Sequence, residues 1–121
     1  MDDGMAKLRE RSFNFALEVI KLVRRLESEQ KEWVLSKQLL KSGTSIGANI
    51  REARFAQSTP DFVSKLSIAL KEAEESVYWL ELLQASGLIS GFELSSLGDD
   101  ANWLVGTLVN IVRRTKDKET S

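Results

Sequence analysis

Residues 34–83 read VLSKQLLKSGTSIGANIREARFAQSTPDFVSKLSIALKEAEESVYWLELL, and this stretch decides the fold. Its centre, Ser58-Thr59-Pro60-Asp61, is a helix start: a hydroxyl residue precedes a proline, and an acid follows in the first turn. On both sides of this start, apolar residues recur every three to four positions, as in an amphipathic helix. We therefore predict two helices, over about 30–56 and about 60–86, and assign Ser28 as the N-cap of the first.

The flanking sequence predicts two more helices. Residues from about 5 to 27 carry two adjoining apolar stripes, which form one broad face suited to a bundle core. The stripes consist of Leu8, Phe15, Val19, Leu22 and Leu26, and of Phe13, Ala16, Leu17, Ile20 and Val23. Gly87 is suited to end the third helix, and a capping box from Ser90 to Glu93 starts the fourth, over about 91–116.

Short connections between helices of similar length force neighbouring helices to run antiparallel. The predicted fold class is therefore all-α, an antiparallel up-down-up-down four-helix bundle formed by a single domain over residues 1–121. Gly43 and Gly47 lie one turn apart inside the second helix, where each glycine costs about 1 kcal/mol relative to alanine. The close approach of another helix would explain both glycines, and a local kink is the competing explanation.

The last predicted helix is apolar over more of its circumference than one bundle contact needs. Val105 and Val109 belong to a second stripe, and Trp103 lies outside both stripes. We interpret these residues, together with Trp33, as candidates for helix or subunit packing. A second burial surface of this kind predicts self-association.

The composition excludes several classes of chemistry. The chain has no Cys and no His, so disulfides, thiolate metal sites and catalytic triads built on histidine are absent. Glutamates at 72, 74, 75 and 81 lack the histidine partners of bundle di-metal centres. We predict no enzyme activity, no metal and no cofactor. No apolar run approaches the roughly 20 residues that span a bilayer, and we expect a cytoplasmic protein without a membrane partner.

Basic residues are unevenly distributed, although the net charge is −1. Residues 30–59 carry five basic side chains against two acidic ones, whereas residues 60–90 carry two against five. Arginine pairs also lie near the ends of the first and last helices, where they either complement the helix dipole or contact nucleic acid at opposite poles of the bundle. The candidate nucleic-acid contacts are Arg24, Arg25, Lys37, Lys41, Arg51, Arg54, Arg113 and Arg114.

Two further patterns leave alternatives open. A polar stripe follows the apolar face of the second helix and is either a hydrogen-bonded seam between helices or subunits or a ligand-binding groove. It consists of Gln38, Ser42, Ser45, Asn49 and Glu52. Trp79 is expected to pack in the core, whereas Trp33 and Trp103 are candidates for an interface or for stacking on unpaired bases.

Three long segments carry a family resemblance. They are QLLKSGTSIGANIREA at residues 38–53, the helix start from Ser58 to Phe62, and IALKEAEESVYWLELL at residues 68–83. The first helix, with FALEVIKLVRRL at residues 15–26, also fits. With these segments the chain resembles the 23S rRNA intervening-sequence proteins, four-helix bundles encoded in bacterial large-subunit ribosomal RNA genes or standing alone in bacterial genomes.

The resemblance implies an antiparallel four-helix bundle that assembles into a ring, most simply a homopentamer, and implies no enzyme activity. A related branch resembles the accessory variability proteins of diversity-generating retroelements, which are basic rings that bind nucleic acid and partner a reverse transcriptase. This chain departs from that branch because it is slightly acidic overall.

Two functions from different classes follow as expectations. The first is a non-enzymatic oligomeric adaptor that associates with RNA or with a nucleic-acid-processing protein. The alternative is a protein–protein scaffold without nucleic-acid binding. Salt-dependent association with RNA distinguishes the two.

Overall fold

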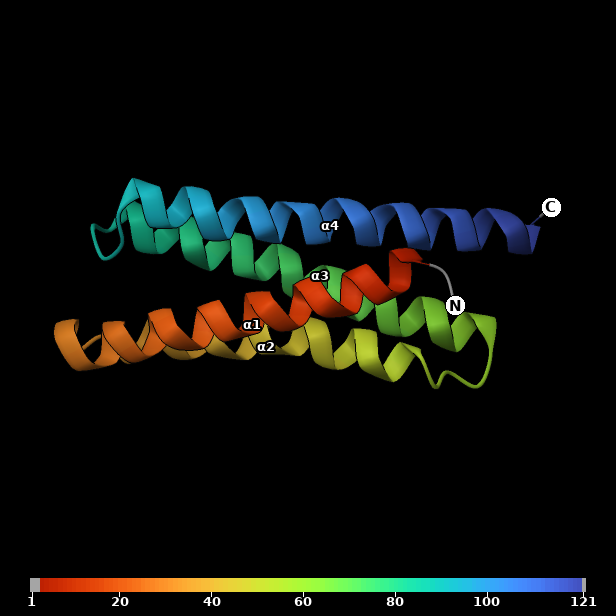
Figure 1. The fold of residues 1–121 in the computed structure, drawn as a ribbon, viewed down its shortest axis with the longest axis horizontal. Helices are drawn as coiled ribbons and strands as arrows, with labels where there is room; N and C mark the ends of the chain where they lie inside the picture. Colours follow the sequence, from red (N-terminus) through yellow and green to blue (C-terminus); the bar gives the residue numbers. More distant parts are fainter. Residues whose placement is uncertain (1–2, 121) are drawn as a thin grey trace.

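The computed structural model describes residues 3–120, which form four α-helices: α1 (Asp3–Gln30), α2 (Val34–Ala53), α3 (Thr59–Ala85) and α4 (Gly91–Thr120). Successive helices run in opposite directions along one long axis (Figure 1). Each helix packs against two others in the order α1, α2, α3, α4 and back to α1. The predicted all-α four-helix bundle is therefore confirmed. None of the described helices contains an apolar window long enough to cross a bilayer.

All four helices contribute to one apolar core. Its largest fully buried side chains include Phe15, Leu39, Ile46, Leu66, Leu80, Leu104 and Leu108. The broad apolar face predicted for the first helix is only partly buried, because Phe13 and Leu17 of α1 remain 54% and 42% exposed. Since α1 contacts only α2 and α4, a face wider than those two contacts leaves one edge in solvent.

The ends of α3 and the start of α4 follow the predicted motifs. Ser58 Oγ accepts a hydrogen bond from the Asp61 N–H at 3.1 Å, which caps α3. Gly87 has a positive φ of 84°, which glycine adopts without strain, and directs the chain out of α3. Ser90 and Glu93 then form the reciprocal capping box of α4, with bonds of 3.0 and 3.1 Å.

The corner between α1 and α2 differs from its prediction. Ser28 is not an N-cap, because α1 continues through Gln30 and ends with Lys31 at a positive φ of 55°. The Glu32 N–H then donates to the Leu26 carbonyl at 3.1 Å, which ties the chain after α1 back to its last turns. Good helix formers at the end of α1 therefore extend the helix past the predicted break.

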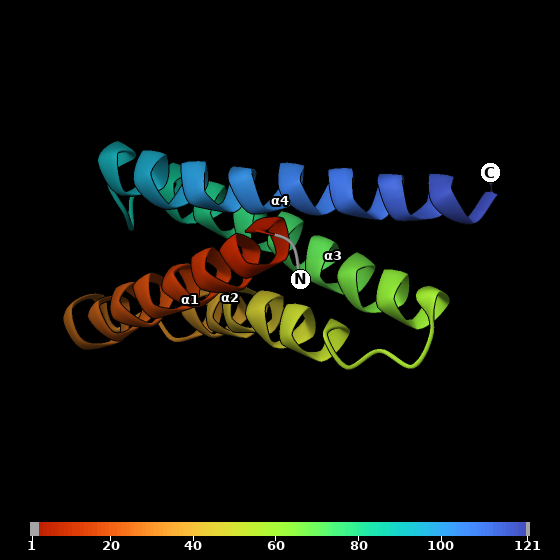
Figure 2. The ribbon, with the colours of Figure 1, turned by 45° about the vertical axis from the view of Figure 1, so that its right-hand side comes forward.

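The bounds of α2 and α4 also differ from their predictions. The chain from Arg54 to Ala56 bonds to carbonyls three residues back, and this tighter turn ends α2 at Ala53 instead of about 56. In contrast, α4 continues to Thr120 instead of about 116, and its last turns project beyond the start of α1 in both views (Figures 1 and 2).

The start of α2 is capped by a glutamate side chain. Glu32 accepts hydrogen bonds from the N–H groups of Leu35 at 3.0 Å and Ser36 at 2.8 Å. Burial acts to raise the pKa of Glu32, but the hydrogen bonds from Leu35, Ser36 and Val34 outweigh it and lower this pKa from its ordinary value of 4.5. The ionised carboxylate therefore stabilises the folded chain.

We expect Glu32→Ala to lower the free energy of unfolding by about 1 kcal/mol at neutral pH, the usual cost of losing an N-cap. Because the folded pKa of Glu32 is lowered, its contribution is present above the unfolded pKa and disappears as pH falls through the folded value. Urea unfolding of both proteins across acidic and neutral buffers checks this. Glu29→Ala, at an exposed neighbouring site, is the control. An equal loss for Glu32→Ala at every pH would contradict the capping role.

Candidate nucleic-acid interface

Positive charge gathers at one end of the bundle. Residues 3–11, 51–65 and 111–120 meet there, because α1 and α3 begin and α2 and α4 end on the same side (Figure 1). These ranges contain ten basic and six acidic residues, whereas residues 12–50 and 66–110 contain seven and eleven. We call this end the basic pole. The net charge is therefore close to zero because a positively charged pole and a negatively charged remainder of the bundle nearly cancel.

Four arginines supply unneutralised charge at the basic pole: Arg51 and Arg54 of the α2 end, and Arg113 and Arg114 of α4. All four side chains are exposed, and none forms an ion pair with another described residue. In contrast, Lys65 Nζ lies 3.2 Å from Glu52 Oε1 at the same pole. The four arginines are thus available to an anionic partner.

The other predicted contacts lie away from the basic pole. Arg24 and Arg25 are in the last part of α1, and Lys37 and Lys41 are in the first half of α2. Arg25 is also occupied, since its guanidinium pairs with the Glu93 carboxylate at the start of α4. The prediction that the arginine pairs of the first and last helices lie at opposite poles is confirmed (Figure 1).

Two adjoining hollows lie between α1 and α2 near the basic pole. The first has a volume of about 590 Å³, and its lining includes Phe13, Arg51, Arg54 and Phe55. The second has a volume of about 390 Å³, shares Phe13 and Arg51 with the first, and continues along the two helices past Gly47. Together they form an open track that combines aromatic rings with cations.

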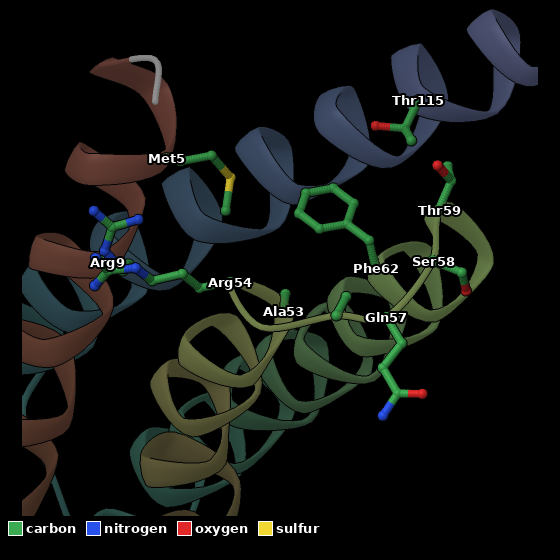
Figure 3. A pocket seen from close by; sticks show the side chains of 10 residues that line it. Met5, Arg9, Ala53, Arg54, Gln57, Ser58, Thr59, Phe62 and Thr115 are labelled. Carbon is green, nitrogen blue, oxygen red and sulfur yellow. The ribbon is translucent and has the colours of Figure 1, made fainter.

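A third hollow, of about 730 Å³, lies at the very end of the bundle. All four helices or their connections contribute to its lining (Figure 3). Phe62 projects between Met5 of α1 and Thr115 of α4, and Arg54 lies on the side of α2. Arg54 thereby lines both this hollow and the first one, which connects the end of the bundle to its α1–α2 side.

The glycines of α2 mark a close approach between α2 and α1. A Cβ atom at Gly43 would lie 3.0 Å from both γ-carbons of Val19 in α1. A Cβ atom at Gly47 would lie 3.2 Å from Ser12 Oγ. The predicted close approach of another helix is confirmed, and the partner is α1 of the same chain.

The polar stripe of α2 forms hydrogen bonds inside the bundle. Ser42 Oγ and Ser76 Oγ are buried and lie 2.9 Å apart across the α2–α3 contact. Ser76 Oγ also lies 2.9 Å from the Glu72 carbonyl oxygen, and Asn49 Nδ2 donates to the Ser45 carbonyl at 2.9 Å. The interpretation as a seam between helices therefore describes Ser42, whereas Asn49 bonds within α2 itself.

The residues expected to form a second apolar surface on the last helix are half-buried in the single chain. Trp103 and Val105 pack against the core, and Val109 keeps part of its surface in solvent. Their role in subunit packing stays a prediction. The guanidinium of Arg11 also covers Trp103, 3.9 Å from the ring centroid. Among the described residues, the large apolar side chains that remain exposed are Phe13, Leu17, Trp33, Val34, Phe55, Ile68, Tyr78 and Phe92.

Sequence reasoning missed Phe13 and Phe55 as parts of this site. Phe13 belongs to a helical apolar stripe, and the stripe alone gives no sign that its edge is exposed. Phe55 offered a usable signal, because it lies next to Arg54 and three residues before the helix start at Ser58. An aromatic residue outside the apolar face and beside a cation is typical of an interface.

Comparisons with known proteins point to one family. The model of the 23S rRNA-intervening sequence protein family matches residues 6–110. A solved structure from Bacteroides thetaiotaomicron VPI-5482, described as a protein with unknown function from the S23 ribosomal protein family, is 46% identical. The match covers 91% of this chain and 98% of that one, with a TM-score of 0.89. Among curated proteins, no sequence matches this chain.

Proposed function

Because the chain belongs to the 23S rRNA-intervening sequence protein family, we propose that it is a non-enzymatic, oligomeric, cytoplasmic adaptor that binds RNA through its basic pole. The observation that carries the proposal is the separation of charge, with ten basic against six acidic residues at this pole. Phosphate groups bind arginine strongly through paired, charge-assisted hydrogen bonds. Four arginines that form no ion pair within the described part of the chain fit such contacts.

The acidic half of the molecule does not prevent this binding. A helix of 28 residues such as α1 is about 42 Å long, at about 1.5 Å per residue. At physiological salt, interactions between exposed charges are screened beyond about 8 Å. An RNA strand at the basic pole therefore responds to the local charge and much less to the carboxylates at the far end.

We further propose that the chains assemble into a ring, as the family resemblance implies, with a homopentamer as the expected form. Ile68 and Tyr78 of α3 support this, because they are 41% and 55% exposed on a helix that is otherwise part of the bundle. Contact with a neighbouring chain would remove these apolar side chains from water. A ring would also repeat the basic pole, so several weak contacts would act on one RNA strand.

RNA binding is expected to depend steeply on salt. If each of the four arginines contacts one phosphate, the logarithm of the binding constant should fall with the logarithm of salt concentration with a slope of about −2.8, at about 0.7 per phosphate of a single strand. Titration of labelled RNA between roughly 50 and 200 mM salt measures this slope. Native mass, with absorbance at 260 and 280 nm across the same peak, reports the oligomer. A purified protein that binds no RNA would refute the proposal.

The alternative function is a protein-binding scaffold without affinity for RNA. The observation that favours it is a group of exposed apolar residues at the opposite end of the bundle, where Val34 is 72% and Phe92 is 83% exposed. A scaffold would retain a protein partner at high salt and would carry no RNA. Salt-insensitive retention of a partner therefore separates it from the adaptor.

A further inference from the structure

Two exposed phenylalanines distinguish the first hollow of the basic pole. Phe13 of α1 is 54% exposed, and Phe55, directly after α2, is 74% exposed. Both rings line the same hollow of about 590 Å³, although they are 42 positions apart in the sequence. An exposed phenyl ring forgoes about 2 kcal/mol of stabilisation that burial would supply. Two such rings around one hollow are therefore a surface suited to an apolar, flat partner.

Cations surround these rings. The Arg54 guanidinium carbon lies 5.6 Å from the centroid of the Phe55 ring, within the range of a cation–π contact. Arg51 lines the same hollow one helical turn earlier in α2. Glu10 is the single acidic side chain in the lining of this hollow, against three arginines. The hollow thus combines flat apolar faces with an excess of positive charge.

The other strongly exposed phenylalanine has a different setting. Phe92 lines a hollow of about 490 Å³ at the start of α4, together with Glu18, Glu93 and Asp100. The basic residues there are Lys21 and Arg25, and Arg25 pairs with Glu93. With three acidic and two basic side chains in its lining, this hollow has no excess of positive charge to attract phosphate. Phe92 therefore serves as an internal comparison for Phe55.

From this combination we propose that the hollow binds unpaired nucleotides of a single-stranded RNA, with bases stacked on Phe55 and Phe13 and phosphates held by Arg51 and Arg54. The inference rests on the proposed RNA function and narrows it to single strands. In a duplex the base faces are already stacked, whereas in a single strand they are free for aromatic side chains. The volume lies in the range of about 300–1,000 Å³ typical of small-ligand sites, enough for a nucleotide.

The second hollow provides a continuation for the strand. It shares Phe13 and Arg51 with the first and extends along α1 and α2 past Gly47. A neighbouring nucleotide can therefore follow the same track without leaving the contact with Arg51. A track of this kind is sequence-tolerant, because every base presents a flat face.

The test compares Phe55→Leu with Phe92→Leu in the full chain. The probe is a labelled single-stranded RNA of about 12 nucleotides, within the roughly 4–16 nucleotides of single-strand sites, and the same strand annealed to its complement. We expect Phe55→Leu to weaken single-strand binding roughly tenfold, which is the scale of one lost base-stacking contact, and to change duplex binding less than about twofold. Phe92→Leu should leave both affinities within about twofold of the parent protein.

Several results would overturn the inference. Equal losses of affinity for single-stranded and duplex RNA, or no loss of affinity with Phe55→Leu, would show that the rings do not contact bases. The proposed function would still stand in that case if the parent protein binds RNA. A parent protein that binds neither probe would refute both. Native mass of Phe55→Leu should equal that of the parent protein, and dissociation into smaller species would instead make Phe55 a contact between copies of the chain.

Discussion

Replacing Arg51, Arg54, Arg113 and Arg114 together by glutamine is expected to weaken single-stranded RNA binding on the order of 100-fold near roughly 150 mM salt. Each lost phosphate contact removes one counterion-release contribution, so the salt slope should also flatten by about 2.8. The four side chains are exposed and form no ion pairs among the described residues, so their loss should leave the fold intact. Fluorescence anisotropy across a salt series measures both quantities, and thermal unfolding checks the fold.

A matched variant separates local charge from net charge. Glutamine at Lys21, Arg24, Lys37 and Lys41 removes the same number of charges from exposed sites outside the basic pole. We expect this variant to change RNA affinity by less than about threefold, since screening weakens charges more than about 8 Å from the strand. If the two variants lose the same affinity, binding follows overall charge and the basic pole has no special role.

Gly43→Leu is expected to lower the free energy of unfolding by about 3 kcal/mol or more, a large part of the stability of a small domain. Even the first added atom would lie 3.0 Å from both γ-carbons of Val19, which is fully buried and branched. The remaining leucine atoms have no space between α1 and α2, so the two helices must separate and expose part of the core. Urea unfolding, together with native mass, measures the loss.

Two further variants test the cause of that loss. Val19→Ala combined with Gly43→Ala restores space and should be more stable than the sum of the single changes predicts. Gly106→Ala in α4, where an added Cβ meets no atom within 4 Å, should raise stability by about 0.5–1 kcal/mol through helix propensity alone. Normal stability and mass for Gly43→Leu would contradict the close packing of α1 against α2.

Local chemistry made most helix ends predictable. Ser58 and Ser90 are hydroxyl caps followed three residues later by an acid, and Gly87 supplies the positive φ that ends α3. The α1–α2 corner uses less common chemistry, because Lys31 takes a positive φ and the Glu32 side chain caps the next helix. Neither residue is a usual choice for its position. The sequence therefore favours Ser28, a common N-cap residue, as the boundary between the first two helices.

The candidate site was only partly predictable. Charge counting along the chain found Arg51 and Arg54, since charge depends on residue type alone. Whether an apolar residue is exposed depends on how many helices pack against its face, and that number is a tertiary property. For this reason the sequence places Phe13 on the core face, whereas the packing of α1 against α2 and α4 leaves its ring exposed.

An even number of antiparallel helices brings both described ends of the chain, residues 3 and 120, to the side where the basic pole lies (Figure 1). A fusion partner at either end is therefore tethered beside this surface, since a flexible linker of about ten residues reaches only about 18 Å on average. An acidic affinity tag would compete with RNA at an effective concentration in the millimolar range. The emission of a fluorophore coupled to either end, in contrast, should change when RNA binds nearby. A fluorophore coupled at Lys31, at the opposite end of the bundle, should not respond and serves as the control.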